Sequence, residues 1–477
     1  MDYETVIGLE VHTQLKTSSK LFCNCATVFG AEPNSQTCPV CLGMPGVLPV
    51  MNKKAFEYAI KVGLALNCAI APTTKFDRKN YFYPDLPKNY QISQYDIPIA
   101  QTGWLEIKDK KIGITRVHLE EDSGKLVHPE GVDTQVDYSL VDLNRAGVPL
   151  AEIVSNPEIT SPEEAYQYLI ALKSILIYLG VSDCDMEKGS LRCDANISLR
   201  PKGATKLGTK TEIKNLNSFK SVVKALEFEA NRQAWLLKEG QAVSGETRLW
   251  DDEASETRSM RSKEEIQDYR YFPEPDLMPF SISAEWLKTI KDSLPELPAQ
   301  RKARFISQYQ LSEYDAGVLL QDKTHADFFE ESLKYHPNPK TNSNILTKQV
   351  LSIMNEEKKD LNELNITPQH LAGTAKAFDE GVINSGTTSI VISEIRNNSW
   401  MTVEEFIGKR GLAQISDDSV IEGYVKEVIA KNDKIVGDYK GGKKTALEAL
   451  LGQVMKASKG KAQPDKVRQL LKKHLGS

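Results

Sequence analysis

Hydrophobic and polar positions alternate along several short segments in the first half of the chain. In residues 6–15 the odd positions are mostly apolar, whereas Glu10, His12 and Gln14 occupy even positions. A period of two predicts a β-strand with one buried face and one polar face. Two residues along a strand span roughly 6.6–6.8 Å, so Glu10 and His12 are close enough to share a cation or a substrate group. For this segment alone, a solvated polar face is the simpler interpretation.

Three further segments have the same pattern. Residues 112–122, 191–200 and 210–215 alternate apolar side chains with charged or hydrogen-bonding ones. Their polar sides carry Arg116, His118 and Glu120, then Arg192, Asp194, Asn196, Ser198 and Arg200, then Lys210, Glu212 and Lys214. In the first of them, Glu121 falls on the opposite side, with Val117 and Leu119. Such strands predict a sheet with a concave polar surface, whose carboxylates and cations suit Mg²⁺ and phosphate.

Helical signals and prolines divide the chain. Ser161, Pro162 and Glu164 form a capping signature before an apolar helical face that ends at Gly180, and a second helix is predicted at 218–238. Prolines at 295 and 298 mark a linker. Beyond it the spacing is helical around 298–320, 326–335, 345–357 and 368–380, and shorter amphipathic helices follow residue 413. We therefore predict an α+β protein with a largely antiparallel sheet in residues 1–293, a helical domain at 294–412 and a small helical tail domain at 413–477.

Charge is distributed unevenly. The 477 residues carry a net charge of −5, but residues 424–477 hold 13 Lys/Arg against 5 Asp/Glu, which gives +8 there and −13 elsewhere. No apolar run approaches the roughly 20 residues that span a bilayer. The N-terminal residues include Asp2 and Glu4, where a targeting signal is basic, so we expect a cytoplasmic protein.

Four of the seven cysteines are clustered in two pairs. Cys23 and Cys25 are followed after twelve residues by Cys38 and Cys41. Two close thiolate pairs are typical of a tetrahedral Zn²⁺ site, and four protein ligands leave no open position, so we predict a structural zinc. Four reduced thiols without a metal are the alternative.

Residues 76–88 combine aromatic and cationic side chains. Lys79, Tyr81, Tyr83 and Lys88 lie within this segment. Such a mixture can stack a base and hold phosphates, or it can be a loop that packs its rings into the core.

Several catalytic motifs are missing. The sequence around Gly441 and Lys443 lacks the upstream glycine of a phosphate-binding P-loop, and there is no GxSxG elbow and no convincing cysteine–histidine nucleophile pair. Any hydrolytic step is therefore expected in a partner.

Nine motifs spread along the whole chain closely resemble one family, the B subunits of the amidotransferases that make Gln-tRNA(Gln) or Asn-tRNA(Asn). They are VIGLEVH at 6–12, FDRKNYFYPD at 76–85, QISQ at 91–94, HLEED at 118–122, YSLVDLNR at 138–145, GSLRCDAN at 189–196, KNLNS at 214–218, DYRYFPEPD at 268–276 and GQVMKASKG at 452–460.

The resemblance implies an N-terminal cradle domain, a helical domain and a tail domain that binds tRNA. It also implies that ATP phosphorylates the side-chain carboxylate of Glu-tRNA(Gln) or Asp-tRNA(Asn), and that ammonia then displaces phosphate. The ammonia would come from glutamine, hydrolysed in the amidase (A) partner of the same enzyme, and a small third (C) partner would complete a heterotrimer. Some members of the family lack the cysteines, so the zinc is not expected to be essential for the reaction.

On this basis we expect a catalytic Mg²⁺ site formed by Glu10, His12, Glu121 and Glu212, with Glu120 and Asp194 as near alternates. Phosphate and substrate contacts are expected from Lys79, Tyr81, Tyr83, Lys88, Arg192 and Lys214. Contacts to the tRNA backbone, weakened steeply by salt, are expected from Lys456, Lys459, Lys461, Lys466 and Arg468.

Two other functions fit part of this pattern. In the first, the chain is a non-catalytic tRNA-binding assembly factor whose acidic strands only bind partners. In the second, it is a synthetase-like enzyme that releases AMP and pyrophosphate. The sequence does not decide between Glu-tRNA(Gln) and Asp-tRNA(Asn) as the substrate.

Overall fold

The fold is taken from a computed structural model of the chain, which describes residues 2–108, 110–127, 138–261, 269–415, 417–443, 445–458 and 460–476. The chain divides into two compact units, Met1–Pro298 and Ala299–Ser477. The predicted linker therefore lies at the end of the first unit, and the division of the second unit into two domains stays a prediction.

The first unit is built on a 12-stranded sheet, as counted over the described residues. Its strands are β1 (Tyr3–Gln14), β2 (Ala69–Ile70), β4 (Asp77–Asn80), β5 (Tyr90–Ser93), β6 (Ala100–Ile107), β7 (Lys110–Glu121), β10 (Pro149–Ser155), β11 (Leu191–Pro201), β12 (Thr211–Leu216), β13 (Thr247–Asp251), β14 (Glu256–Arg261) and β15 (Arg270–Pro273). Two small pairs are formed by β3 (Thr73–Thr74) with β16 (Phe280–Ser281), and by β8 (Lys125–Val127) with β9 (Leu140–Asp142).

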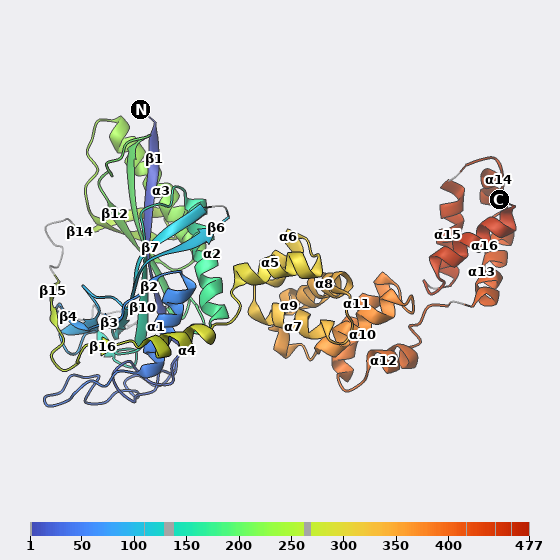
Figure 1. The fold of residues 1–477 in the computed structure, drawn as a ribbon. Coiled ribbons are helices and arrows are strands. Elements are labelled where there is room, and N and C mark those ends of the chain that lie inside the picture. Colours follow the sequence, from blue (N-terminus) through green and yellow to red (C-terminus); the bar gives the residue numbers. More distant parts are fainter. Residues whose placement is uncertain are drawn as a thin grey trace. The chain divides into compact units, whose positions relative to one another are not determined.

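The order along the sheet is β14-β13-β12-β11-β1-β10-β7-β5-β4-β15, with β6 also paired to β7 and β2 to β6. Figure 1 shows β1, β10 and β7 side by side at the centre of this unit. The described pairs in the sheet are antiparallel except for β12 with β13. The predicted α+β class with a largely antiparallel sheet is therefore confirmed.

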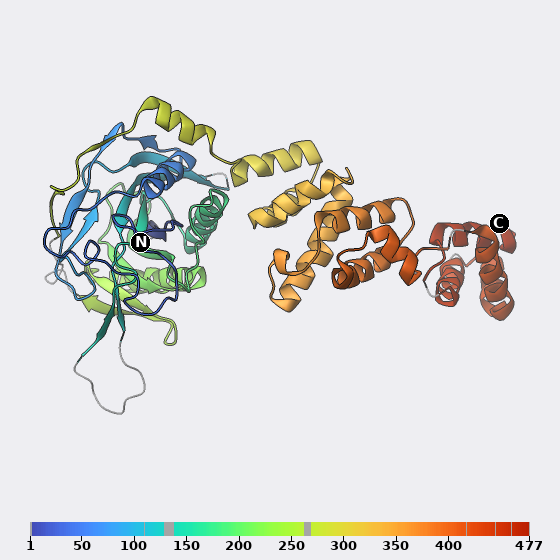
Figure 2. The same cartoon turned by 90° about the horizontal axis from the view of Figure 1, so that it is seen from below.

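Helices cover the apolar face of the sheet. The first unit contains α1 (Lys53–Ala65), α2 (Pro162–Tyr178), α3 (Phe219–Lys238) and α4 (Ala284–Asp292). Side chains from β1, such as Ile7, Leu9 and Val11, share one buried core with α1, α2 and α3. The two views in Figures 1 and 2 both show α2 against the outside of the strands. The alternation in β1 follows from this burial, because only the odd positions reach the helices.

Both helices predicted for this unit form, and a serine caps the start of each. Ser161 accepts a hydrogen bond from the backbone of Glu164 at the start of α2, and Ser218 accepts one from Ser221 at the start of α3. The Glu164 carboxylate does not complete the predicted capping box at Ser161. It accepts instead from the backbone of Thr160 and pairs with Lys110.

The second unit is helical. Its α-helices are α5 (Pro298–Tyr309), α6 (Glu313–Leu319), α7 (Lys323–Leu333), α8 (Pro339–Ile345), α9 (Leu351–Glu357), α10 (Pro368–Asp379), α11 (Ser385–Ile395), α12 (Val403–Arg410), α13 (Asp418–Lys431), α14 (Asp433–Lys440), α15 (Thr445–Ala457) and α16 (Pro464–Leu475). A π-helical turn, η2 (Leu346–Val350), joins α8 to α9, and two 3-10 turns are η3 (Leu361–Glu363) and η4 (Arg396–Asn398).

Two separate groups of buried side chains lie in the later part of this unit. One joins α10, α11 and α12 around Val391 and Phe406, and the other joins α13, α15 and α16 around Val425 and Leu450. Over the described residues, every helix is too short or too polar to cross a bilayer.

Candidate active site and cysteine cluster

A polar cleft of about 480 Å³ opens on the face of the sheet away from the helices. Nine of the residues predicted from the sequence line it, namely Glu10, His12, Lys79, Tyr81, Glu120, Arg192, Asp194, Glu212 and Lys214. They come from β1, β4, β7, β11 and β12 and from the residue after β4. The cleft is the point where the polar sides of these strands meet.

Strand register sets the centre of this cleft. His12 of β1 lies opposite Glu152 of β10 on one side and opposite Arg192 of β11 on the other. Glu152 in turn lies opposite His118 of β7. Arg192, His12, Glu152 and His118 therefore form one row across four neighbouring strands, on the same face of the sheet.

One group of potential metal ligands lies partly within this row and partly beside it. One ligand atom each from His12, Glu120 and Glu152 falls within 4.8 Å of the others. His12 Nε2 is 3.3 Å from Glu152 Oε2 and 3.6 Å from Glu120 Oε1. Two carboxylates and one imidazole can hold a divalent cation, with water at the remaining positions.

A second imidazole orients Glu152. His118 Nε2 lies 3.1 Å from Glu152 Oε2, and its Nδ1 accepts a hydrogen bond from Arg116 Nε at 3.4 Å. Because Nδ1 is an acceptor in this contact, the proton of a neutral His118 lies on Nε2 and is donated to Glu152.

The charges of the cleft are strongly coupled. Burial alone would lower the pKa of His12, but the hydrogen bond and charge of Glu152, with Glu120 and Asp194, raise it above the ordinary value of 6.5. Burial alone would raise the pKa of Glu152, but His118 and His12 hold it well below its usual range. Glu152 is therefore ionised at neutral pH.

Cations surround this acidic centre. Lys214 Nζ lies 2.8 Å from Asp194 Oδ2 and 3.1 Å from Glu212 Oε1. Arg192 donates to Asp122 Oδ1 at 2.7 Å. Although burial opposes their charged forms, the pKa of Lys214 is raised by Asp194 and Glu212, and the pKa of Lys79 is raised by Glu120.

Two pairs of tyrosines form an aromatic edge of the cleft. Tyr95 stacks on Tyr271 with 4.1 Å between ring centroids, and Tyr81 meets Tyr269 edge-on at 5.3 Å. Lys79 Nζ lies 4.8 Å above the ring of Tyr269. These four tyrosines and Lys79 all line the cleft. The cleft therefore offers flat aromatic surfaces beside its charged side chains.

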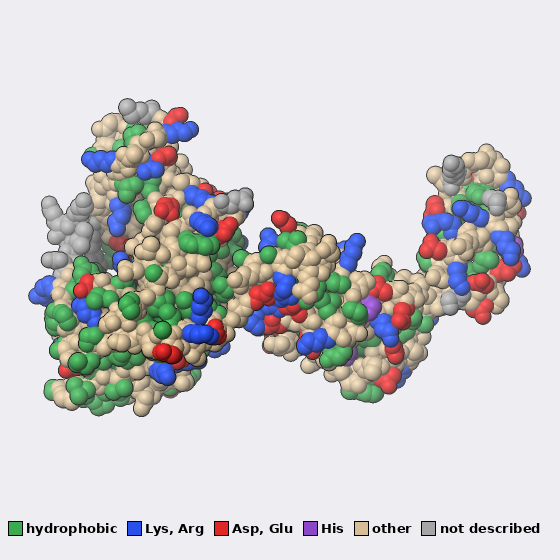
Figure 3. All heavy atoms as spheres, in the orientation of Figure 1, with side chains coloured by type: hydrophobic (Ala, Val, Ile, Leu, Met, Phe, Trp, Pro, Cys, Tyr) green, Lys and Arg blue, Asp and Glu red, His purple; other side chains and the backbone are tan. Residues whose placement is uncertain are grey.

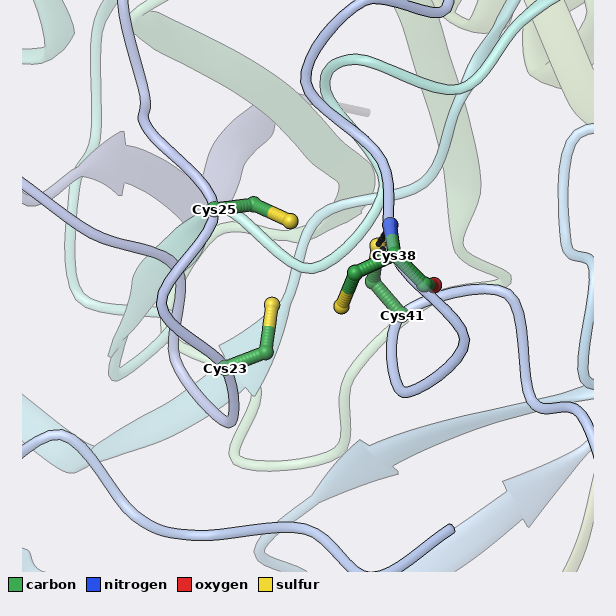
Figure 4. A group of neighbouring side chains, drawn as sticks. All are labelled: Cys23, Cys25, Cys38 and Cys41. Atoms are coloured by element: carbon green, nitrogen blue, oxygen red, sulfur yellow. Dashed lines mark hydrogen bonds between the residues drawn. The ribbon is translucent and has the colours of Figure 1, made fainter.

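The four clustered cysteines converge at a separate place. Cys23 and Cys25 come from one loop and Cys38 and Cys41 from the next, and their sulfur atoms point toward one another (Figure 4). The Sγ atoms lie within 4.8 Å of one another. Tetrahedral Zn²⁺ with bonds of about 2.3 Å needs sulfurs about 3.8 Å apart, so the cluster is compatible with a structural metal.

Comparisons with known proteins identify the family. The model of the GatB/GatE catalytic domain matches residues 5–288, and the model of the GatB domain matches residues 327–475. A protein from Carboxydothermus hydrogenoformans, named as the B subunit of the aspartyl/glutamyl-tRNA(Asn/Gln) amidotransferase, is 55% identical over 99% of both chains. Proteins of the same name from Thermoanaerobacter pseudethanolicus and Geobacillus kaustophilus are 54% and 53% identical over the whole of both chains.

The chain belongs to the GatB family, the B subunits of these amidotransferases.

The match to GatB/GatE catalytic domains begins at residue 5, within β1, and extends beyond β15, so it contains every residue that lines the cleft.

Three predicted site residues of this GatB family member lie outside the cleft. Glu121 projects from the opposite face of β7, where Lys88 Nζ contacts its Oε2 and the backbone N–H of Ile92 donates to it at 3.0 Å. Glu121 and Lys88 line a smaller pocket beside Cys23 and Cys41. The structure thus does not bring Glu121 to Glu10, His12 and Glu212, because adjacent residues of a strand point to opposite faces.

Tyr83 also lies away from the cleft lining, with 46% of the residue's surface exposed. Of the other residues expected at the metal, Glu10 accepts a hydrogen bond from Asn196 at 2.8 Å, and Glu212 accepts one from Thr247 at 2.8 Å. The predicted metal set of Glu10, His12, Glu121 and Glu212 therefore shares one cleft only in part.

Glu152 is the main cleft residue that sequence reasoning missed. It is the single charged residue in residues 149–155, a mostly apolar strand that is buried almost throughout. A lone carboxylate in such a strand needs buried partners, so its presence in the sequence could have indicated that Glu152 belongs to a polar site. Tyr269 and Tyr271 fall in the motif at 268–276 but were not singled out.

Of the predicted tRNA-contact residues, Lys456 lies on α15, Lys466 and Arg468 lie on α16, and Lys461 lies between these two helices. Lys456 is exposed, whereas Lys461 donates to Gly411 O, Lys466 pairs with Asp418 at 2.8 Å and Arg468 pairs with Glu448 at 3.2 Å. Lys459 lies outside the described residues. In Figure 3, cationic and acidic side chains alternate over the visible face of α13 to α16.

Replacing Glu152 tests the metal-binding group. Changing a residue that only orients a ligand weakens metal binding about 10- to 100-fold, so Glu152→Gln, which removes a ligand carboxylate, is expected to weaken Mn²⁺ binding by at least about tenfold. Mn²⁺ titration followed by electron paramagnetic resonance measures it. Glu121→Gln is the matched control and should leave the cleft affinity unchanged. Equal losses in both variants would contradict the assignment.

The pH dependence of metal binding gives a second test. A protonated His12 cannot ligate a metal, so Mn²⁺ affinity should fall as pH decreases through the raised pKa of His12, which lies above 6.5. The affinity should be restored as pH increases, because the neutral imidazole regains its lone pair. In His12→Gln this step should disappear. An affinity in the native protein that is constant between about pH 5 and 8 would rule out His12 as a ligand.

Proposed function

We propose that this chain is the carboxylate-activating and tRNA-binding subunit of a glutamyl/aspartyl-tRNA amidotransferase. In this function the side-chain carboxylate of Glu or Asp, carried on a misacylated tRNA, attacks the γ-phosphorus of ATP, and ADP leaves. Ammonia then attacks the carbonyl carbon of the acyl phosphate, and inorganic phosphate leaves. The relatives' shared name, with its two amino acids and two tRNAs, supports both substrates as candidates.

The observation that carries this proposal is the composition of the cleft. A carboxylate and a nucleoside triphosphate repel each other because both are anions, so the protein must place positive charge near both. The acidic centre of His12, Glu120 and Glu152 lies in one cleft with Lys79, Arg192 and Lys214. Acidic side chains alone could bind a metal ion but would repel the carboxylate and ATP, whereas basic side chains alone could bind both anions but no metal ion.

The lysines and the arginine have distinct tasks in this scheme. Lys79 lies beside the aromatic edge and holds a phosphate of a nucleotide stacked on the tyrosines. Lys214 and Arg192, on β12 and β11, orient the substrate carboxylate. Burial opposes both positive charges, but Asp122 raises the pKa of Arg192, and Asp194 and Glu212 raise the pKa of Lys214. Both groups are therefore charged at neutral pH. The nucleophile is already an anion, so the first step needs no general base.

His12, Glu120 and Glu152 would hold Mg²⁺, and Glu10 and Glu212 line the same cleft. This set differs from the sequence prediction in three ways: Glu120, expected as an alternate, takes the place of Glu121, Glu152 is added, and Glu10 and Glu212 are no longer direct ligands. The bound ion supplies positive charge to the phosphate oxygens. The second imidazole, on His118, contacts Glu152 and would orient its carboxylate for the ion.

The four-cysteine cluster would hold a structural Zn²⁺. Its four sulfurs fill a tetrahedral coordination sphere, and it lies on the side of β7 that carries Glu121, away from the polar cleft. The metal would fix the loops at 23–41 and would have no direct part in phosphoryl transfer.

The other proposed contacts involve macromolecules. The basic excess after residue 424 supports tRNA binding by the last helices, although Lys461, Lys466 and Arg468 must exchange their present partners for phosphates. The amidase (A) partner would supply ammonia from glutamine, and the small third (C) partner would complete the heterotrimer.

The proposal is tested with Glu-tRNA(Gln), Mg²⁺ and ATP labelled in its γ-phosphate. The native protein, purified with its amidase partner, should form ADP and label the aminoacyl group. His12→Asn should reduce labelling roughly a hundredfold or more, because a metal contributes several kcal/mol of transition-state stabilisation. Binding of tRNA and assembly with the partner should be unchanged.

His336→Asn is the matched control, since His336 pairs with Asp379 in the second unit, at 2.6 Å. Labelling that survives in His12→Asn would favour a non-catalytic assembly factor. Release of AMP and pyrophosphate by the native protein would favour a synthetase-like enzyme.

A further inference from the structure

Lys20 is a charged residue that the proposed reaction does not use. Its side chain is completely buried and is among the largest fully buried side chains of the described residues. Burying an ammonium group without a compensating negative charge costs several kcal/mol. The position of Lys20 therefore requires a partner of opposite charge.

The contacts of Lys20 identify that partner. Its Nζ lies 3.6 Å from Cys41 Sγ and 3.3 Å from the carbonyl oxygen of Leu143. Among the described residues no carboxylate forms an ion pair with Lys20, and the nearby Glu121 is paired with Lys88. The anionic group within reach of the ammonium is therefore the cysteine sulfur.

The charge of a filled cysteine cluster matches this arrangement. Four thiolates around one Zn²⁺ carry a net charge of −2, since each thiolate contributes −1 and the ion +2. Such an excess is unfavourable where the sulfurs are partly buried, and a fixed ammonium beside one sulfur offsets it. The backbone N–H of Cys38 adds a second donor to Cys41 Sγ, at 3.2 Å.

We propose that Lys20 is a positioning residue of the cysteine metal centre, whose buried ammonium offsets the charge of the metal-bound thiolates and thereby retains the zinc. This inference rests on the zinc site proposed above. It assigns Lys20 no part in phosphoryl transfer, because the residue lies in the pocket beside Cys23 and Cys41 and not in the polar cleft.

The second contact explains how Lys20 is held in place. Leu143 lies in the loop that follows β9. In this loop Asn144 accepts from the backbone N–H of Gln36 at 2.8 Å, and Val141 O of β9 accepts from Asn34 at 3.0 Å. This loop therefore braces the segment between the two cysteine pairs. By donating to Leu143 O, Lys20 connects this loop to the sulfur of Cys41.

The test measures zinc retention in the full-length protein. Zinc-loaded native protein and variants are mixed with a chromogenic chelator, and the competition gives the affinity for Zn²⁺. Lys20→Met keeps the length of the side chain and removes its charge, so the affinity should fall by about 10- to 100-fold. Lys20→Arg keeps the charge and should retain zinc far better than Lys20→Met. Lys16→Met, at an exposed lysine four residues away, should match the native protein.

Each outcome decides one question. A Lys20→Met protein that retains zinc like the native one overturns the role of Lys20, and so does a Lys20→Arg protein that loses as much zinc as Lys20→Met. A native protein that binds no zinc overturns the zinc centre itself, independently of the carboxylate-activating function. Circular dichroism of the variants reports folding, and Lys20→Gln replaces Lys20→Met in the same assay if the latter does not fold.

Discussion

The antiparallel register of four central strands is the constraint on which the cleft depends. β11, β1, β10 and β7 pair so that Arg192, His12, Glu152 and His118 stand in one row. A slip of one residue in any of these pairings would turn that strand's polar side chains toward the helices and its apolar ones toward solvent. The apolar face of the same strands, packed against α1, α2 and α3, therefore fixes the chemistry of the other face.

Burying the charged groups of the cleft is energetically unfavourable, and their interactions with one another offset this cost. His118, Glu120 and Glu152 are nearly inaccessible to solvent, and isolated buried charges are strongly unfavourable. Each has a partner of opposite charge or a hydrogen bond, so the group is stable only as a set. This same coupling perturbs the pKa values of His12 and Glu152, a feature that is common at functional sites. The end of β7 serves two sites, because Glu120 faces the cleft and Glu121 faces the cysteine side.

Local patterns in the sequence predicted much of this structure, since alternation and capping depend on neighbouring residues. The strands at residues 6–15 and 112–122 and the helix after Ser161 were found in this way. Alternation also places Glu120 and Glu121 on opposite sides of their strand. The expectation that Glu121 lies beside Glu10 and His12 ignored this and was wrong. The pairing of His12 with Glu152, 140 positions away along the chain, is set by tertiary packing and is not readable from either segment.

The proposed phosphoryl transfer depends on one metal ion held by His12, Glu120 and Glu152. Anomalous diffraction from crystals of the protein with Mn²⁺ locates such an ion directly. We expect a single strong peak in the polar cleft, bonded to these three side chains and to water. A peak on the other side of β7 at Glu121, or an empty cleft at saturating Mn²⁺, would contradict it.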